Sequence, residues 1–150
     1  MCASDQEQIR TVYLALESIR DLQGNHLVYD EPPGSLILLA YLGLCPKDDP
    51  VFQNTCEMLY ASDAPYAFIG TNFAELGCAH ANHPWVLSFC NRILSATHTQ
   101  TGIEQMLTME MDNGLACESI DEYTGKAKTG EAFATCAGLY AYTLMRIFCE

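Results

Sequence analysis

Apolar side chains recur every three or four residues along much of this chain, which is the spacing of one face of an α-helix. The residues from Ile9 to Ile19 show the pattern first. It predicts helices over 5–22, 36–44, 50–60, 84–94, 101–111 and 131–148. We find no convincing alternation of apolar and polar residues, as a half-buried strand would show. The sequence therefore predicts an all-α fold built from helical hairpins.

The starts of three helices carry further signals. Ser35 stands where a side chain could cap the helix over 36–44. Asp49 and Pro50 open the next helix, where an acidic cap and a first-turn proline are favoured. The helix over 84–94 is apolar nearly all round, and its first turn holds Trp85, the single tryptophan. We expect that helix to lie inside the fold.

Two long stretches, 61–82 and 112–130, lose the helical period. Loops of this length in a compact domain are usually functional or disordered. The first contains Tyr66, Phe68, Phe73 and Leu76, and so many large apolar groups require burial. We therefore expect an ordered loop with a function.

Charge and cysteine spacing exclude some partners. The 150 residues include 19 Asp and Glu against 7 Lys and Arg, a net charge of -12 that predicts no nucleic-acid partner. No apolar run is long enough for a membrane helix, and the N-terminus resembles no secretory signal, so we expect no membrane partner and a cytoplasmic protein. The 8 cysteines lie far apart without a CxxC motif, which favours reduced structural thiols.

Chemistry-bearing side chains gather in the loops. Glu118 has apolar or small neighbours, and such an environment favours the proton transfers of a general acid or base. The alternative is a carboxylate that accepts a hydrogen bond from a backbone N–H. His80 and His83 lack a third ligand at a typical spacing, so we expect hydrogen bonds or a polar ligand there and no metal. Trp85 is either ordinary core or a platform for a sugar ring. No nucleotide-binding motif occurs, and we expect no cofactor.

Motifs between Gly24 and Tyr140 follow the order that they take in one enzyme family. Its motifs GNHLLMDDANVPSLL with PYLG, DPIYQNT, DNPYYFSG, EGIGGPH and HESF correspond to GNHLVYDEPPGSL (24–36) with YLG (41–43), DPVFQNT (49–55), DAPYAFIG (63–70), ELGCAH (75–80) and CESI (117–120). HPWV at 83–86 stands at the family's WP helix start. The chain thus resembles glycoside hydrolase family 125, the metal-independent exo-acting α-mannosidases. Cys117 and TGEAFAT at 129–135 differ from the family pattern and indicate a divergent branch.

The resemblance implies an (α/α)6 toroid of helical hairpins with a sugar pocket formed by loops at one end. It also implies inverting, metal-free hydrolysis of a terminal α-mannoside, with the general-base role falling on Glu118. An inverting site holds its acid and base about 6.5–9.5 Å apart, with a water between the base and the sugar. By position, the residues expected to line the sugar pocket are Asp30, Glu31, Glu75, His80 and Trp85.

Members of the family are longer, and their general acid is an aspartate in an upstream motif that this chain lacks. The resemblance therefore implies that residues 1–150 form a single helical domain, the C-terminal portion of a larger catalytic domain and about half of its toroid. An open half-toroid would expose an apolar flank, so we expect self-association. The alternative is a non-catalytic helical module that binds carbohydrate or another protein.

Overall fold

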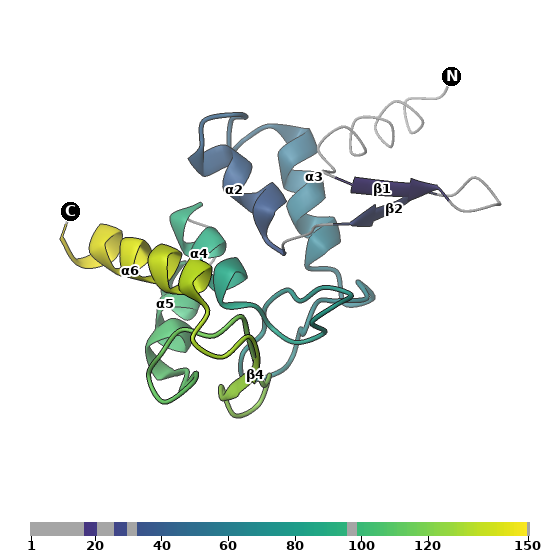
Figure 1. Cartoon of the computed structure of the whole chain (residues 1–150). Helices are drawn as coiled ribbons and strands as arrows, with labels where there is room; N and C mark the ends of the chain where they lie inside the picture. The colour runs from purple at the N-terminus through teal and green to yellow at the C-terminus, as the bar shows by residue number, and fades with distance from the viewer. Residues whose placement is uncertain (1–16, 21–25, 30–32, 96–98, 150) are drawn as a thin grey trace, which may run out of the picture.

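The computed structural model describes residues 17–20, 26–29, 33–95 and 99–149, and it is mostly helical (Figure 1). Its helices are α2 (Ser35–Tyr41), α3 (Pro50–Leu59), α4 (Val86–Leu94), α5 (Thr99–Thr108) and α6 (Ala134–Phe148). Its strands are β1 (Glu17–Arg20), β2 (His26–Tyr29), β3 (Ser119–Ile120) and β4 (Ala127–Thr129). They form two antiparallel pairs, β1 with β2 and β3 with β4. The helical character is as expected, but the two short strand pairs are not.

The first strand pair replaces part of a predicted helix. Glu17–Arg20 lies inside the helix expected over 5–22, yet it pairs with β2, from Glu17 opposite Tyr29 to Arg20 opposite His26. The sequence of β2, HLVY, contains the β-branched and aromatic residues that favour strands. A helical period reports only local spacing, and here pairing with a neighbouring segment decides the structure. Residues 5–16 and 21–22 of the expected helix lie outside the described residues.

The helix starts confirm one expected cap and correct another. Asp49 caps α3, because its Oδ1 accepts a hydrogen bond from the Val51 backbone N–H at 2.8 Å, and Pro50 begins the helix. In α2, Ser35 is the first helical residue, and the cap position is taken by Gly34 with φ of +83°. A Cβ on Gly34 would lie 2.8 Å from Ser88 Oγ. The glycine thus lets the start of α2 approach α4, and a Ser35 cap is not formed.

Helix α4 is the centre of the fold, as its all-round apolar sequence predicts. It contacts α2, α5 and α6, and in Figure 1 it lies between α2 and the α5–α6 pair. Eight of its nine residues, Val86 to Ile93, are buried. Met106 of α5 and Cys136 of α6 complete the same core. None of the described helices is long and apolar enough to cross a membrane.

The two long loops join each other where α4 begins. The Phe73 N–H donates to Glu122 O at 3.0 Å, and the Ile120 N–H donates to Pro84 O at 2.9 Å. The Val86 N–H donates to Glu118 O at 3.1 Å. Phe73 and Leu76 are buried, as the first loop's apolar content requires. The residues expected to carry chemistry therefore come together from two distant parts of the sequence.

Candidate functional site

The backbone of Glu118 is held from both sides. Its N–H donates to Gly130 O at 3.0 Å and to Thr129 O at 3.2 Å, and its carbonyl accepts from Val86. Gly130 has φ of +57°, and a Cβ there would lie 2.5 Å from Glu118 Cβ. Only glycine combines this left-handed backbone with so close an approach. These backbone hydrogen bonds and the close approach of Gly130 thus fix the position of the Glu118 Cα and Cβ atoms.

The Glu118 carboxylate has a different partner at each oxygen. Thr129 Oγ1 donates to Oε2 at 2.7 Å, and Ser119 Oγ lies 2.6 Å from the same threonine oxygen. His80 Nε2 lies 3.8 Å from Oε1. The side chain of Glu118 is 15% exposed and that of His80 58%. These partners are a hydroxyl and an imidazole, so the structure does not favour the alternative of a carboxylate bonded to a backbone N–H.

His80 connects Glu118 to a thiol and an indole. Its Nδ1 lies 3.4 Å from Cys78 Sγ, and its ring meets the Trp85 ring edge-on at 5.2 Å between centroids. Trp85 is 4% exposed, and its Nε1–H donates to Ala81 O at 3.1 Å. This burial favours the core alternative for Trp85. As a sugar platform the indole would have to be uncovered first.

Glu75 is also close to the start of α4 but lies in the interior. Its Oε1 accepts hydrogen bonds from Tyr60 Oη at 2.5 Å, Ser88 Oγ at 2.9 Å and the Leu76 N–H at 3.0 Å. Arg92 Nε lies 2.8 Å from Oε2. Burial raises the pKa of Glu75 above its ordinary value, and the arginine and the donors oppose that rise. The Glu75 side chain has no exposed surface, and it links Tyr60, just after α3, to the first loop and α4. This structure therefore does not support the predicted sugar contact.

The other sequence predictions for the site have mixed outcomes. His83 Nδ1 lies 3.0 Å from Glu122 Oε2, so this histidine bonds within the joined loops, as expected. Asp30 and Glu31 lie outside the described residues. In the part of the chain that the structure describes, no three potential ligands gather as a metal site would require.

Sequence reasoning missed Thr129, Ser119 and Arg92. Arg92 carried a signal, since it is the one charged residue in the apolar helix α4. A buried arginine requires a carboxylate partner. The sequence contains no such signal for Thr129 and Ser119, because their contact depends on the register of β3 against β4.

Two buried thiols contact backbone oxygens of the Glu118 segment. Cys117 Sγ donates to Ser119 O at 3.2 Å, and Cys136 Sγ lies 3.9 Å from Glu118 O. Burial raises the pKa of Cys117 to about 11 and that of Cys136 to about 12. Both therefore stay protonated near neutral pH and act as small core residues. The described cysteines are free thiols, at positions 45, 56, 78, 90, 117, 136 and 149.

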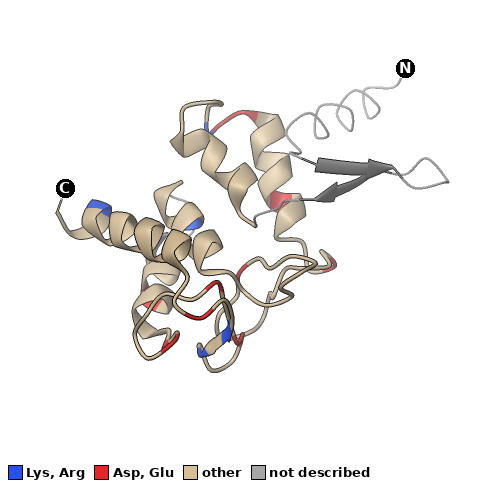
Figure 2. Cartoon of the chain, in the orientation of Figure 1, with Lys and Arg blue, Asp and Glu red and all other residues tan. Residues whose placement is uncertain are grey.

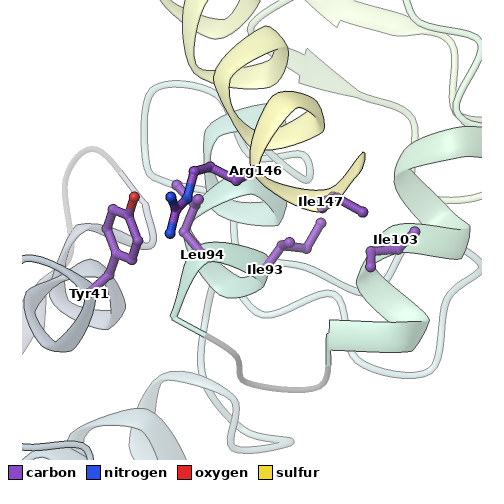
Figure 3. A pocket seen from close by; sticks show the side chains of 6 residues that line it. All are labelled: Tyr41, Ile93, Leu94, Ile103, Arg146 and Ile147. Atoms are coloured by element: carbon purple, nitrogen blue, oxygen red, sulfur yellow. The ribbon is translucent and has the colours of Figure 1, made fainter. Parts of the chain in front are cut away.

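A separate hollow of about 360 Å³ lies at the opposite end of α4 (Figure 3). Four of its six lining residues are aliphatic, and the full lining comprises Tyr41, Ile93, Leu94, Ile103, Arg146 and Ile147. It holds no carboxylate and so offers no pair of acid and base. The hollow therefore lies apart from the Glu118 carboxylate and its partners.

Comparison with known proteins gives a relative and a family for the chain. The chain is 27% identical over 117 residues to the meiotically up-regulated gene 157 protein of Schizosaccharomyces pombe, an alignment that covers 74% of this chain and 23% of the relative. It thus spans about a quarter of that relative's length. No solved structure matches the chain. Residues 5–145 match the metal-independent α-mannosidases, and the chain therefore belongs to glycoside hydrolase family 125.

Proposed function

We propose that this chain carries the general base of an inverting, metal-independent glycoside hydrolase that acts on terminal α-mannosides. One observation carries the proposal: Glu118 is a partly exposed carboxylate with Oε2 fixed by Thr129 and Oε1 toward the exposed His80. Family membership supports the substrate class. Among the residues predicted to line the sugar pocket, His80 is the one whose placement supports that role most directly.

In this proposal Oε1 accepts a proton from a water molecule. The water oxygen attacks the anomeric carbon on the face opposite the leaving group, the bond to the leaving oxygen breaks, and the product is the β-anomer. A general acid must protonate the leaving oxygen at the same time. We place that acid outside this chain, in an upstream part of a longer protein.

The fraction of the relative that is matched, 23%, supports reading the chain as a part of a catalytic domain. We propose that the helices described here form about half of an (α/α)6 toroid and that a preceding portion supplies the rest. That preceding portion would then supply the general acid. The cytoplasmic location stays a prediction.

A substrate that needs no general acid tests the base alone. In 2,4-dinitrophenyl α-mannoside the leaving phenolate departs without protonation. We expect the full chain to hydrolyse it and the first product, observed by NMR, to be β-mannose. Glu118→Gln should lower the rate about 10²–10⁴-fold, since a general base contributes about that much. Glu110→Gln, at an exposed carboxylate, is the matched control and should leave the rate unchanged.

Azide makes the assignment of the base more specific. In Glu118→Ala the removed side chain leaves space for azide, an anionic nucleophile that needs no base to deprotonate it. We expect added azide to restore turnover and to give β-mannosyl azide. Hydrolysis that survives Glu118→Gln, or an α-configured azide product, would contradict the proposal.

A second candidate role, protein interaction, is favoured by the outer face of α6. Met145 is 48% exposed and Phe148 64%. The first half of the helix exposes small residues instead, namely Ala134, Ala137, Gly138 and Ala141. Figure 2 shows a basic residue and no acidic one on α6, although the chain carries a net charge of -12. We propose a second copy of the chain as the partner of this face.

Two copies of α6 complement each other when they run antiparallel. The large side chains of one copy then lie over the small residues of the other, as a two-fold symmetric interface requires. The absence of acidic residues from α6 keeps the repulsion between two acidic chains away from the contact. Sedimentation should show a dimer for the full chain and a monomer for Met145→Glu. A monomer at all concentrations would contradict this role, and Leu107→Glu on the exposed face of α5 is the control.

A further inference from the structure

We propose that Thr129 is a positioning residue for Glu118, and that Ser119 fixes the direction of the Thr129 hydroxyl. The inference rests on the proposed function, since it concerns the orientation of the proposed base. It begins from two contacts, Thr129 Oγ1 to Glu118 Oε2 at 2.7 Å and Ser119 Oγ to Thr129 Oγ1 at 2.6 Å.

The proton order in this chain of hydroxyls follows from the partners. An ionised carboxylate only accepts hydrogen bonds, so Thr129 must donate its single hydroxyl proton to Glu118. Ser119 must then donate its own proton to Thr129 Oγ1. Bonds in such a chain polarise each other, which strengthens the contact to the carboxylate. Ser119 is fully buried, so water does not compete for its hydroxyl.

The backbone holds these groups in register. Ser119 and Thr129 are paired across β3 and β4, and the Glu118 N–H donates to Thr129 O. The hydroxyl that orients the carboxylate therefore comes from the strand beside it. A displacement of Thr129 would require the β3–β4 pair to open.

Orientation matters because a carboxylate turns easily. The last torsion of a glutamate side chain has a broad, roughly two-fold preference. The hydrogen bond from Thr129 engages Oε2 and leaves Oε1 on the side of the exposed His80. The water to be activated would then meet one defined oxygen. A misplacement of about 1 Å at a reacting group can cost about 100-fold in rate.

The kinetic test uses paired variants of the full chain with the dinitrophenyl mannoside. Thr129→Val keeps the shape and removes the hydroxyl, and we expect kcat to fall about 10- to 100-fold with little change in KM. Thr129→Ser restores the hydroxyl and should recover most of the rate. Ser119→Ala should have a smaller effect, because it acts through Thr129.

Azide separates positioning from a merely structural role. If Thr129 acts through the carboxylate, Thr129→Val should not change the azide-dependent rate of Glu118→Ala. An equal loss in that background would show that the substitution damages the site, and it would overturn the inference. A Thr129→Val variant with wild-type kcat would overturn it as well.

A spectroscopic readout keeps the inference distinct from the proposed function. A hydroxyl hydrogen bond gives a hydrogen–deuterium isotope effect on the carboxyl ¹³C signal of Glu118. We expect this effect in the wild type and in Thr129→Ser, and its loss in Thr129→Val. If the wild type shows the effect but hydrolyses no mannoside, the proposed function fails and the catalytic part of the inference with it. If it hydrolyses mannoside without the effect, the inference alone fails.

Discussion

Glu75 and Glu118 are two loop glutamates near the start of α4, and the structure gives them opposite surroundings. Glu75 has no exposed surface, accepts three hydrogen bonds at Oε1 and pairs with Arg92 at Oε2. Glu118 is partly exposed and is held mainly through Oε2. The first carboxylate bonds through both oxygens to residues that hold the fold, whereas the second has Oε1 on the side of the exposed His80. Residue type and motif position do not reveal this difference, but burial does.

The largest effect should follow from separating Glu75 from Arg92. Glu75→Leu leaves a buried guanidinium without its carboxylate, and we expect the free energy of unfolding to fall by about 3–5 kcal/mol. Unfolding in urea measures this change in free energy. Replacing both partners, Glu75→Leu with Arg92→Met, should recover most of the loss, because the uncompensated charge is gone. If the free energy of unfolding of Glu75→Leu lies within about 0.5 kcal/mol of the wild-type value, the contrast with Glu118 is removed.

The Gly130 position should give the next largest effect, and it acts on the Glu118 side of the comparison. Gly130→Ala places a Cβ against Glu118 Cβ in a left-handed backbone. We expect a loss of stability of about 1–3 kcal/mol from the strained backbone, with further cost from the collision. Turnover should fall as the carboxylate is displaced.

Gly114 provides the matched control for Gly130. Its φ is +85°, and nothing lies within 4 Å of the position that a Cβ would take. Gly114→Ala therefore reports the backbone strain alone and should leave turnover unchanged. Equal effects of the two alanines on turnover would show that the approach of Gly130 to Glu118 does not matter for the site.

The sequence predicts these features to different extents. The helical period identifies α3 and the buried α4 because one element's own residues determine them, as Asp49 and Pro50 do at the start of α3. The β1 strand escapes the same reasoning, since its conformation depends on β2. The apolar neighbours of Glu118 and its motif predict a site residue at this position. Its contact with Thr129 depends on strand register, which composition and periodicity do not specify.

Asp121, in the same loop as Glu118, should give the smallest effect and sharpens the comparison with Glu75. Hydrogen bonds from the Thr124 N–H, the Lys128 ammonium and the Tyr123 N–H hold the pKa of Asp121 well below its usual range. A lowered pKa stabilises the fold above the ordinary value of 3.8 and loses that contribution as the pH falls below it. Asp121→Asn should therefore cost stability at neutral pH and progressively less in acid.

Glu75 should show the opposite pH dependence in the same unfolding measurement, because burial raises its pKa. A raised carboxyl pKa stabilises the fold most below the ordinary value of 4.5, and the contribution declines as the pH rises through the folded-state pKa. The stability difference between wild type and Glu75→Gln should thus decrease with rising pH, while that between wild type and Asp121→Asn increases. Parallel trends would mean that desolvation does not dominate at Glu75. The two carboxylates would then differ in exposure without differing in the balance of forces on their charge.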